Sequence, residues 1–157
     1  MIAFCEYESP LGMLVLAADE RGLCRVGLHA QPGPEMVQKD TPVLAATRAQ
    51  LDEYFVGRRT AFDLPLSETG TGFQKQVWAA LRAIPWGETR SYGQIAAAVG
   101  RPAAARAVGG ACHANPLLIV TPCHRVVGAG GALTGFGAGL PAKEFLLALE
   151  HPEPSRP

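Results

Sequence analysis

The sequence lacks the features of a membrane protein or of a disulfide-stabilised secreted protein. No apolar run approaches the roughly 20 residues that span a bilayer, and the N-terminal segment MIAFCEYESP carries acidic residues instead of the basic region of a secretory signal. Cysteine is scarce, with 4 residues at positions 5, 24, 112 and 123, too few and too scattered for a disulfide framework. We therefore expect a cytoplasmic protein with free thiols and no membrane partner.

Net charge is also absent, because 14 basic residues balance 14 acidic ones. The balance hides an uneven distribution: residues 1–68 carry six basic and ten acidic side chains, whereas residues 69–150 carry seven basic and three acidic ones. One half of the chain is thus suited to face phosphates and the other is not. With 157 residues, 48% of them hydrophobic, the chain can bury a substantial core.

The first half has the pattern of a small α+β domain. Three apolar segments, residues 2–8, 13–18 and 23–28, are separated by turn residues and predict a three-stranded antiparallel meander. Thr41 followed by Pro42 is a helix start, and apolar residues continue at helical spacing to Gly57. A short strand is expected at residues 62–66. We place the domain at residues 1–68, with a linker-like stretch at residues 67–72.

The second half, residues 69–151, is predicted to be mainly helical. A helix is expected from Phe73 to Ile84, and the Ser91–Gln94 capping box should open a short helix that Gly100 closes. A second short helix should follow from about Pro102 to His113, which gives the outline of a helix-turn-helix. A closing helix at residues 143–150 should turn Phe145, Leu146 and Leu149 inward, and residues 152–157 form a tail.

The helix after Pro102 is unusual because alanine and glycine surround its one long side chain, Arg106. So thin a helix could enter a DNA minor groove about 6 Å wide, with the arginine inserted. Small residues equally serve close packing of one helix against another. The composition leaves both interpretations open.

The segment 119–127, IVTPCHRVV, concentrates the reactive side chains. Proline restricts both its own backbone and that of Thr121, so the pair should hold Cys123 at a rigid bend between two apolar anchors. The neighbouring His124 and Arg125 are the cations that would lower a thiol pKa and favour the nucleophilic thiolate. A buried structural cysteine followed by surface residues is the alternative.

Several motifs in the second half, taken together, resemble one known family. They are Ser91-Tyr92, residues 105–110 (ARAVGG), Asn115-Pro116, residues 122–127 (PCHRVV) and a glycine-rich loop leading to residues 146–150 (LLALE). In order and spacing they are similar to the methylated-DNA-protein-cysteine methyltransferases, also called O6-alkylguanine-DNA alkyltransferases. The resemblance is specific over residues 70–150 and looser around Ser9–Gly12 and Gly22-Leu23.

This resemblance implies an α+β fold with two parts: a ribonuclease-H-like antiparallel sheet with a helix, then a mainly helical, winged helix-turn-helix-like domain. It implies a direct-reversal DNA repair protein that acts on double-stranded DNA as a monomer, without a cofactor. The alkyl group of O6-alkylguanine, and of O4-alkylthymine, would pass irreversibly to Cys123 after the nucleotide is flipped out through the minor groove. Because a thioether is not hydrolysed, each molecule would act once.

The resemblance also assigns roles to the residues that match the family motifs. His124 would draw the thiol proton through a water, Glu150 would orient His124, Tyr92 would donate a proton toward the leaving guanine oxygen, and Asn115 would brace the turn. Arg106 would enter the base stack. The other DNA-binding positions would be Arg101, Ala105, Gly109 and Arg125, and the base pocket would be walled by Val126, Phe136, Gly137 and Gly139.

Three positions depart from the pattern of many family members, and all three affect the width of the pocket. Phe136 stands where some members carry tyrosine, Leu118 where many carry proline, and Gly137 where some carry serine. Zinc-bearing members use an N-terminal Cys/His cluster, but Cys5, Cys24 and His29 lack its usual CxxC spacing, so no metal is expected.

Two other functions fit part of the sequence. A DNA-binding damage sensor of the same fold would lack the acceptor cysteine. A cysteine hydrolase built on Cys123, His124 and Glu150 would turn over, whereas an alkyl acceptor would not.

Overall fold

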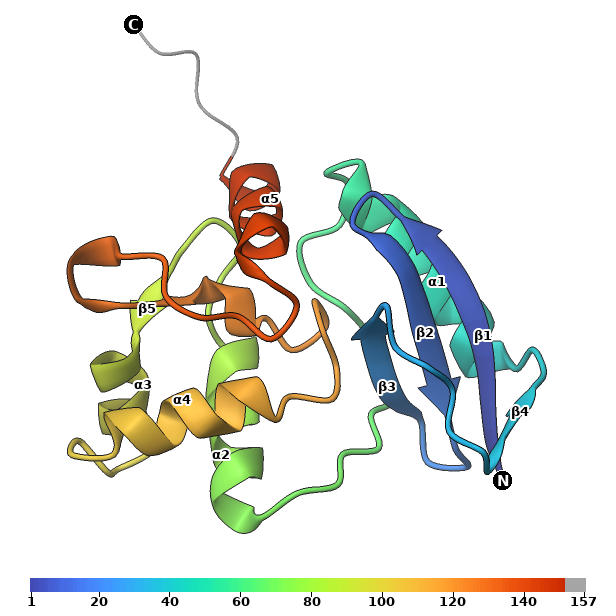
Figure 1. The fold of residues 1–157 in the computed structure, drawn as a ribbon, viewed down its shortest axis with the longest axis horizontal. Coiled ribbons are helices and arrows are strands. Elements are labelled where there is room, and N and C mark those ends of the chain that lie inside the picture. The colour runs from blue at the N-terminus through green and yellow to red at the C-terminus, as the bar shows by residue number, and fades with distance from the viewer. Residues whose placement is uncertain (152–157) are drawn as a thin grey trace, which may run out of the picture. The chain divides into compact units, whose positions relative to one another are not determined.

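The computed structural model describes residues 1–151, which form two compact units (Figure 1). Met1–Thr69 and Pro116–Val120 make up the first unit, and Gly70–Asn115 with the described residues from Thr121 onward make up the second. The chain therefore leaves the second unit once, for five residues, immediately before the segment that carries Cys123. The expected tail at residues 152–157 lies outside the described residues.

The first unit contains a four-stranded sheet in the order β3-β2-β1-β4. Strands β1 (Ile2–Ser9), β2 (Gly12–Ala18) and β3 (Leu23–Leu28) pair antiparallel as predicted. Strand β4 (Met36–Gln38), which pairs parallel to β1, was not predicted, because three residues are too few to show an alternating pattern. The strand expected at residues 62–66 was wrong: only Leu66 forms a bridge, to Leu23.

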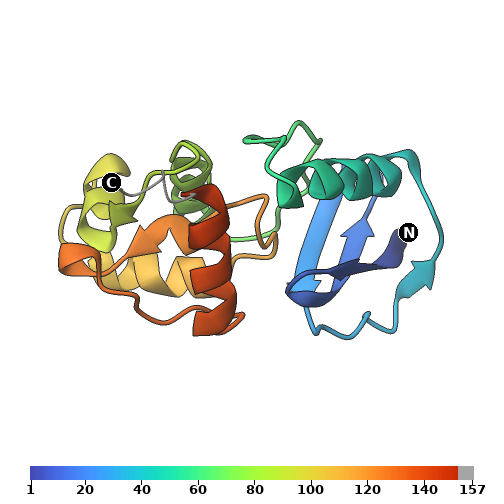
Figure 2. The same ribbon diagram turned by 90° about the horizontal axis from the view of Figure 1, so that it is seen from above.

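Helix α1 (Pro42–Phe55) covers one face of this sheet (Figure 2). It begins as predicted, with the Thr41 side chain accepting a hydrogen bond from the backbone N–H of Leu44. The side chains that the helix buries recur at helical spacing: Leu44, Thr47, Leu51 and Tyr54. This spacing, together with the Thr41 cap, explains why the helix could be recognised in the sequence.

The excursion Pro116–Val120 adds a short parallel bridge beside β3. The Val26 N–H donates to the Pro116 carbonyl at 2.8 Å, and the Leu118 N–H donates to the Val26 carbonyl at 3.1 Å. Ile119 is buried with φ +72°, a left-handed conformation that a β-branched residue rarely adopts. The core of the first unit thus holds strained backbone four residues before Cys123.

The second unit is built from helices and one small parallel strand pair. Its elements are α2 (Gly72–Arg82), β5 (Arg90–Ser91), α3 (Tyr92–Ala98), α4 (Ala105–His113), β6 (Val126–Val127) and α5 (Leu140–Glu150). The predicted Ser91–Gln94 capping box is present at the start of α3. Helix α4 begins three residues later than predicted, because the chain from Arg101 to Ala104 closes a separate turn.

Helix α5 begins three residues earlier than predicted, with Pro141 in its first turn. Its buried side chains are Ala142, Lys143, Leu146 and Glu150, so the expected inward position of Phe145 was wrong. Phe145 is 39% exposed, whereas Lys143 and Glu150 share the buried face with Leu146.

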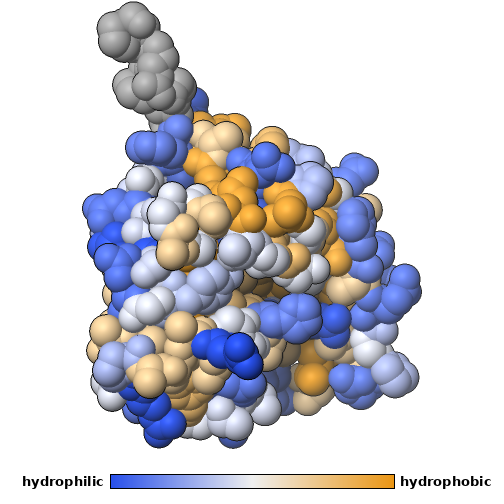
Figure 3. Space-filling view, turned by 60° about the vertical axis from the view of Figure 1, so that its left-hand side comes forward, coloured by the Kyte–Doolittle hydropathy of each residue, from blue (hydrophilic) through white to orange (hydrophobic). Residues whose placement is uncertain are grey.

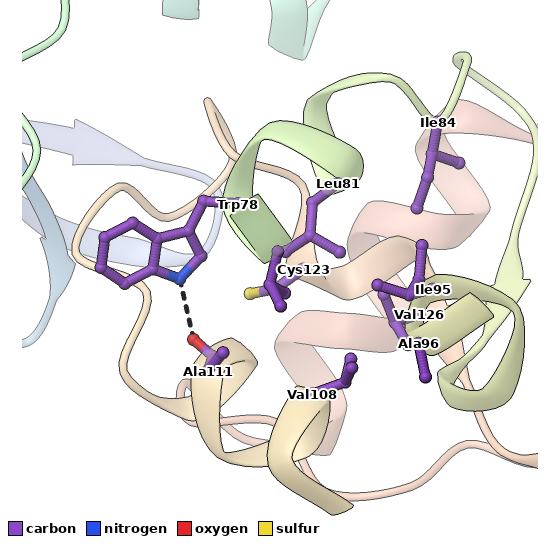
Figure 4. Packing of buried hydrophobic residues seen from close by; sticks show 10 residues of the cluster. Trp78, Leu81, Ile84, Ile95, Ala96, Val108, Ala111, Cys123 and Val126 are labelled. Carbon is purple, nitrogen blue, oxygen red and sulfur yellow. Dashed lines mark hydrogen bonds between the residues drawn. The ribbon is translucent and has the colours of Figure 1, made fainter. Parts of the chain in front are cut away.

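The core of the second unit joins α2, α3 and α4 to the segment that carries Cys123. Trp78, Leu81, Ile84, Ile95, Ala96, Val108, Ala111, Cys123 and Val126 gather there (Figure 4). The buried Trp78 indole N–H donates to the Ala111 carbonyl at 2.9 Å and ties α2 to α4. The pairing of Arg90 with Val126 and of Ser91 with Val127 holds the start of α3 beside the residues that follow the cysteine.

Apolar side chains also remain on the surface of the second unit. Leu133 is 41% exposed and Leu140 is 43% exposed. On the face drawn in Figure 3, orange groups gather in the upper part, with blue groups around them. Among the described residues, no helix is both long and apolar enough to cross a bilayer.

Candidate active site

Cys123 lies at a tight turn that the preceding proline creates. Pro122 has φ −81° and ψ 67°, and the Cys123 N–H donates to the Thr121 carbonyl at 2.8 Å, which is an inverse γ-turn. One turn of 3-10 helix, Cys123–Arg125, follows directly. The rigid bend predicted from the Thr-Pro pair is therefore present as a hydrogen-bonded turn.

The thiol of Cys123 is buried, with 7% of the residue exposed. The side-chain N–H2 of Asn115 donates to the Cys123 Sγ at 3.3 Å and to the Thr121 carbonyl at 2.8 Å. Asn115 thus fixes the turn and the sulfur together. Burial raises the pKa of the thiol, and the Asn115 hydrogen bond and the positive charge of Lys143 oppose that rise.

The expectation that His124 and Arg125 lower the thiol pKa through their charge was wrong. The Arg125 guanidinium binds Glu150, with Nε 2.7 Å from Oε1 and Nη2 3.0 Å from Oε2, and its Nη1 donates to the Ile84 carbonyl at 2.6 Å. Burial lowers the pKa of His124, so its imidazole is neutral near pH 7. The cation that acts on the thiol is Lys143, which is remote in sequence.

His124 and Glu150 form a buried pair suited to proton transfer. The His124 Nε2 lies 2.6 Å from the Glu150 Oε2, and both residues are at most 2% exposed. Hydrogen bonds from His124 and Arg125 lower the pKa of Glu150 to about 2, so the carboxylate is charged and Nε2 must be the donor. Nδ1 is then the unprotonated nitrogen of a neutral imidazole, and within residues 1–151 it has no hydrogen-bond partner.

Lys143 is the site residue that the sequence analysis missed. Its side chain is fully buried, and Nζ donates to the carbonyls of Val126 at 2.7 Å and Thr134 at 3.3 Å. Burial lowers the pKa of Lys143, and the charges of the Cys123 and Cys112 thiolates would raise it. A helical wheel of α5 contains the missing signal, because Lys143 shares a face with Leu146 and Glu150.

A cavity of about 400 Å³ opens onto the sulfur. Its lining consists of Tyr92, Gly109, Cys112, His113, Cys123, Gly135, Phe136 and Gly137. Three of these residues are glycines, which have no side chain to fill the cavity. A volume in this range suits a small-molecule ligand or a single base. Phe136 and Gly137, which were expected in the pocket, are among the lining residues.

Two other residues expected at the pocket lie elsewhere. Val126 is fully buried in the core, and its carbonyl accepts the Lys143 hydrogen bond. Gly139 precedes α5, where its φ of +98° requires glycine, and its N–H donates to the Phe136 carbonyl at 2.9 Å. Both shape the segments that bound the cavity without lining it.

Tyr92 is the first residue of α3 and lines the cavity. Its hydroxyl lies 3.0 Å from the Thr134 Oγ1. The β5–β6 pairing described above positions it, because Ser91, the residue before Tyr92, pairs with Val127. Two separate segments, the turn Cys123–Arg125 and the start of α3, thus bring a thiol and a phenol to one cavity, and the neutral His124 directly follows the thiol.

The residues expected to bind DNA are only partly gathered on α4. Arg106 is exposed beside Ala105, and Gly109 of the same helix lines the cavity. Arg101 is exposed, with its guanidinium 5.4 Å from the centre of the Phe73 ring. Arg125 is 6% exposed and bound to Glu150, which contradicts its assignment to the DNA surface.

Cys5, Cys24 and His29 all belong to the first unit. No three His, Cys, Asp or Glu side chains among residues 1–151 gather in a group that could hold a metal ion.

Two family models match this chain in succession. One is described as the ribonuclease-like domain of 6-O-methylguanine DNA methyltransferase and matches residues 3–67. The other is described as the DNA binding domain of the same protein and matches residues 72–152.

Curated proteins similar to the chain carry a matching name. A methylated-DNA–protein-cysteine methyltransferase of Methanosarcina acetivorans is 48% identical over 148 residues, 92% of this chain and 95% of the relative. A constitutive enzyme of that name in Bacillus subtilis is 50% identical, over 91% of this chain and 92% of the relative.

Solved structures share the fold as well. The crystal structure of Mycobacterium tuberculosis OGT in complex with DNA superimposes with a TM-score of 0.89 and 45% identity, and covers 95% of this chain and 92% of that one. An O6-methylguanine DNA methyltransferase from Methanococcus jannaschii superimposes with a TM-score of 0.70 at 26% identity, over 97% of this chain and 96% of that one.

Proposed function

The chain belongs to the 6-O-methylguanine DNA methyltransferase family, and from that membership and the geometry of the site we propose that Cys123 is the alkyl acceptor. The protein is a methylated-DNA–protein-cysteine methyltransferase, an enzyme of DNA repair. Its substrate is O6-alkylguanine, and also O4-alkylthymine, in double-stranded DNA. The alkyl group passes irreversibly to the sulfur, so one molecule of protein repairs one base.

The observation that carries this proposal is the buried thiol at the end of a cavity, next to a neutral imidazole. A thiol whose pKa is raised by burial is protonated at rest, so it needs a base before it can attack. His124 Nδ1 is the available base, and we place one water between it and the sulfur. The charged Glu150 then stabilises the imidazolium that forms, as the carboxylate of a triad does.

Two neighbouring groups stabilise the thiolate. Asn115 donates to the sulfur, and the buried charge of Lys143 favours the anion. The thiolate attacks the alkyl carbon, the carbon–oxygen bond breaks, and the electron pair goes to the guanine oxygen. Tyr92, on the cavity wall, donates the proton that neutralises this leaving group.

The alkylated cysteine is the end point of this reaction. The product is a thioether, which water does not hydrolyse, and the thiol is already enclosed by the core. A cysteine hydrolase would form a thioester that water can cleave, and it would turn over. Single turnover is therefore the kinetic property that separates the two functions.

The base reaches the cavity by leaving the duplex. Chemistry on a paired base requires that it be flipped out of the stack. Arg106 on the exposed face of α4 is the residue that fills the gap, and the small side chains around it allow the helix to enter the minor groove. The protein does this as a monomer in the cytoplasm.

The test is the intact mass after incubation with duplex DNA that contains O6-methylguanine. We expect a gain of one methyl group in place of one hydrogen, stoichiometric with the base repaired, and peptide mapping should place it on Cys123. Cys123→Ser should bind DNA and gain no mass. Methylation mapped to Cys5, Cys24 or Cys112, or release of more product than protein, would contradict the proposal.

A further inference from the structure

The loop between β6 and α5 holds one polar side chain against the proposed proton donor. Thr134 is half-buried, and its Oγ1 lies 3.0 Å from the hydroxyl oxygen of Tyr92. Forty-two residues separate the two in sequence. The contact is therefore a product of the tertiary fold, and the sequence analysis did not single out Thr134.

Two contacts of Thr134, together with a hydrogen bond within its loop, hold it in this orientation. Its carbonyl accepts a hydrogen bond from the buried Lys143 Nζ at 3.3 Å. Its methyl group packs over Gly128, where an added Cβ would lie 2.9 Å from the Thr134 Cγ2. The Gly128 N–H donates to the Ala132 carbonyl at 2.7 Å and closes the loop. With the methyl group and the carbonyl fixed, the hydroxyl is directed at Tyr92.

The direction of the Tyr92–Thr134 hydrogen bond has a chemical consequence. Each hydroxyl has one proton to donate, and either could be the donor in this pair. If Tyr92 donated to Thr134, its proton would be occupied when the guanine arrives. If Thr134 donates, the phenol proton is free to point into the cavity.

We propose that Thr134 is a positioning residue that donates its hydroxyl proton to Tyr92 and so aims the Tyr92 proton at the leaving guanine. This inference rests on the proposed function, because it assigns a partner to a residue of that site. The sulfur–carbon bond forms, the carbon–oxygen bond breaks, and the Tyr92 proton goes to the guanine. Thr134 then donates to the phenolate, which regains through solvent the proton that left the thiol.

A purely structural role for Thr134 would have a different signature. Its side chain could simply limit the width of the cavity entrance, since the neighbouring Gly135 and Phe136 line the cavity. A change in width would affect every substrate of the same size equally. A role in proton donation affects only those substrates whose leaving group needs a proton.

The experiment compares two small benzyl donors of similar size under single-turnover conditions. O6-benzylguanine has a basic leaving group, whereas a benzyloxypyrimidine that carries a nitro group leaves without protonation. Thr134→Val keeps the shape and removes the hydroxyl. We expect it to slow transfer from O6-benzylguanine about five- to tenfold, as for the loss of one hydrogen bond, and transfer from the nitropyrimidine less than about twofold. Thr134→Ser should restore the rate.

The double-mutant cycle with Tyr92→Phe adds the specific readout. In the Tyr92→Phe background, Thr134→Val should cost nothing further, because the phenol that it serves is gone. Equal slowing of both donors, an unchanged rate, or the same loss with and without Tyr92 would overturn the proposal. If Thr134→Val does not fold, Thr134→Ala replaces it. This variant should also slow transfer from O6-benzylguanine more than transfer from the nitropyrimidine.

Failure of this inference differs from failure of the proposed function. If wild-type protein gains no methyl group on Cys123 from duplex DNA that contains O6-methylguanine, the proposed function is wrong. If wild type reacts with both donors and Thr134→Val reacts equally well with both, only the role of Thr134 is wrong.

Discussion

Replacing Glu150 with glutamine should destabilise the protein and slow alkyl transfer at the same time. The carboxylate is 2% exposed and accepts hydrogen bonds from His124 at 2.6 Å and from Arg125 at 2.7 and 3.0 Å. Glutamine keeps the shape but not the charge. The Arg125 guanidinium, itself 6% exposed, is then left without its counter-charge.

The depressed pKa of Glu150 gives the size of the effect. The pKa is lowered from 4.5 to about 2, which corresponds to about 3 kcal/mol in favour of the folded protein when the carboxylate is charged. Because the folded-state pKa is the lower one, this contribution is complete above about pH 5 and is lost as the pH falls toward 2. Glutamine does not titrate, so the difference between wild type and Glu150→Gln should follow the same curve.

The assay is urea denaturation of both proteins at pH 7 and at pH 3, with Glu144→Gln as the control. Glu144 lies on the same helix and is exposed, so its substitution should change the free energy of unfolding by less than about 0.5 kcal/mol. For Glu150→Gln we expect a loss of about 3 kcal/mol at pH 7 and less than half of that at pH 3.

Transfer to Cys123 from O6-benzylguanine, measured on the folded protein, should also slow, because the imidazolium of His124 loses its stabilising charge. A loss below about 1 kcal/mol at pH 7 would refute the argument. A loss of equal size at both pH values would refute it as well, since it would show that the charge of Glu150 is not what stabilises the fold.

Substitutions at three further positions test the other groups of the site. Lys143→Met removes the positive charge near Cys123, so the thiol pKa should rise and transfer at pH 7 should fall about tenfold and recover at higher pH; a rate that falls equally at every pH would point to packing instead. Asn115→Ala removes the hydrogen bonds to the sulfur and to the Thr121 carbonyl, so it should slow transfer from both duplex DNA and the free base. Transfer by this variant at the wild-type rate would show that these hydrogen bonds do not assist the reaction. Arg106→Ala and Arg106→Lys should slow transfer from saturating duplex far more than from free O6-benzylguanine, whereas wild-type rates on duplex would make Arg106 an ordinary phosphate contact.

Much of the fold could be predicted because its signals are local. The strands β1 to β3 follow from apolar runs between turn residues, and α1 and α3 follow from the caps at Thr41 and Ser91. A cap hydrogen bond joins residues only three positions apart, so both partners can be recognised in a short stretch of sequence. The elements that were missed, β4 and the β5–β6 pair, have two or three residues each. They form only by pairing with a strand that is distant in sequence.

The candidate site divides in the same way. The turn at Pro122 and the neighbouring Cys123 and His124 can be read from consecutive residues, and the resemblance to a family supplied Tyr92 and Glu150. The partner of Arg125 could not be predicted, because the guanidinium binds a carboxylate 25 residues later in the chain.

What the sequence alone determined is therefore the rigid turn that holds the proposed nucleophile and the helices around it, all set by contacts within a few residues. The tertiary structure decided which charges act on the thiol. It buried Arg125 against Glu150, placed Lys143 within electrostatic reach of Cys123 and set Thr134 against Tyr92. Electrostatic and hydrogen-bond energies depend on distance and burial, and both are fixed only when segments far apart in the chain pack into one core.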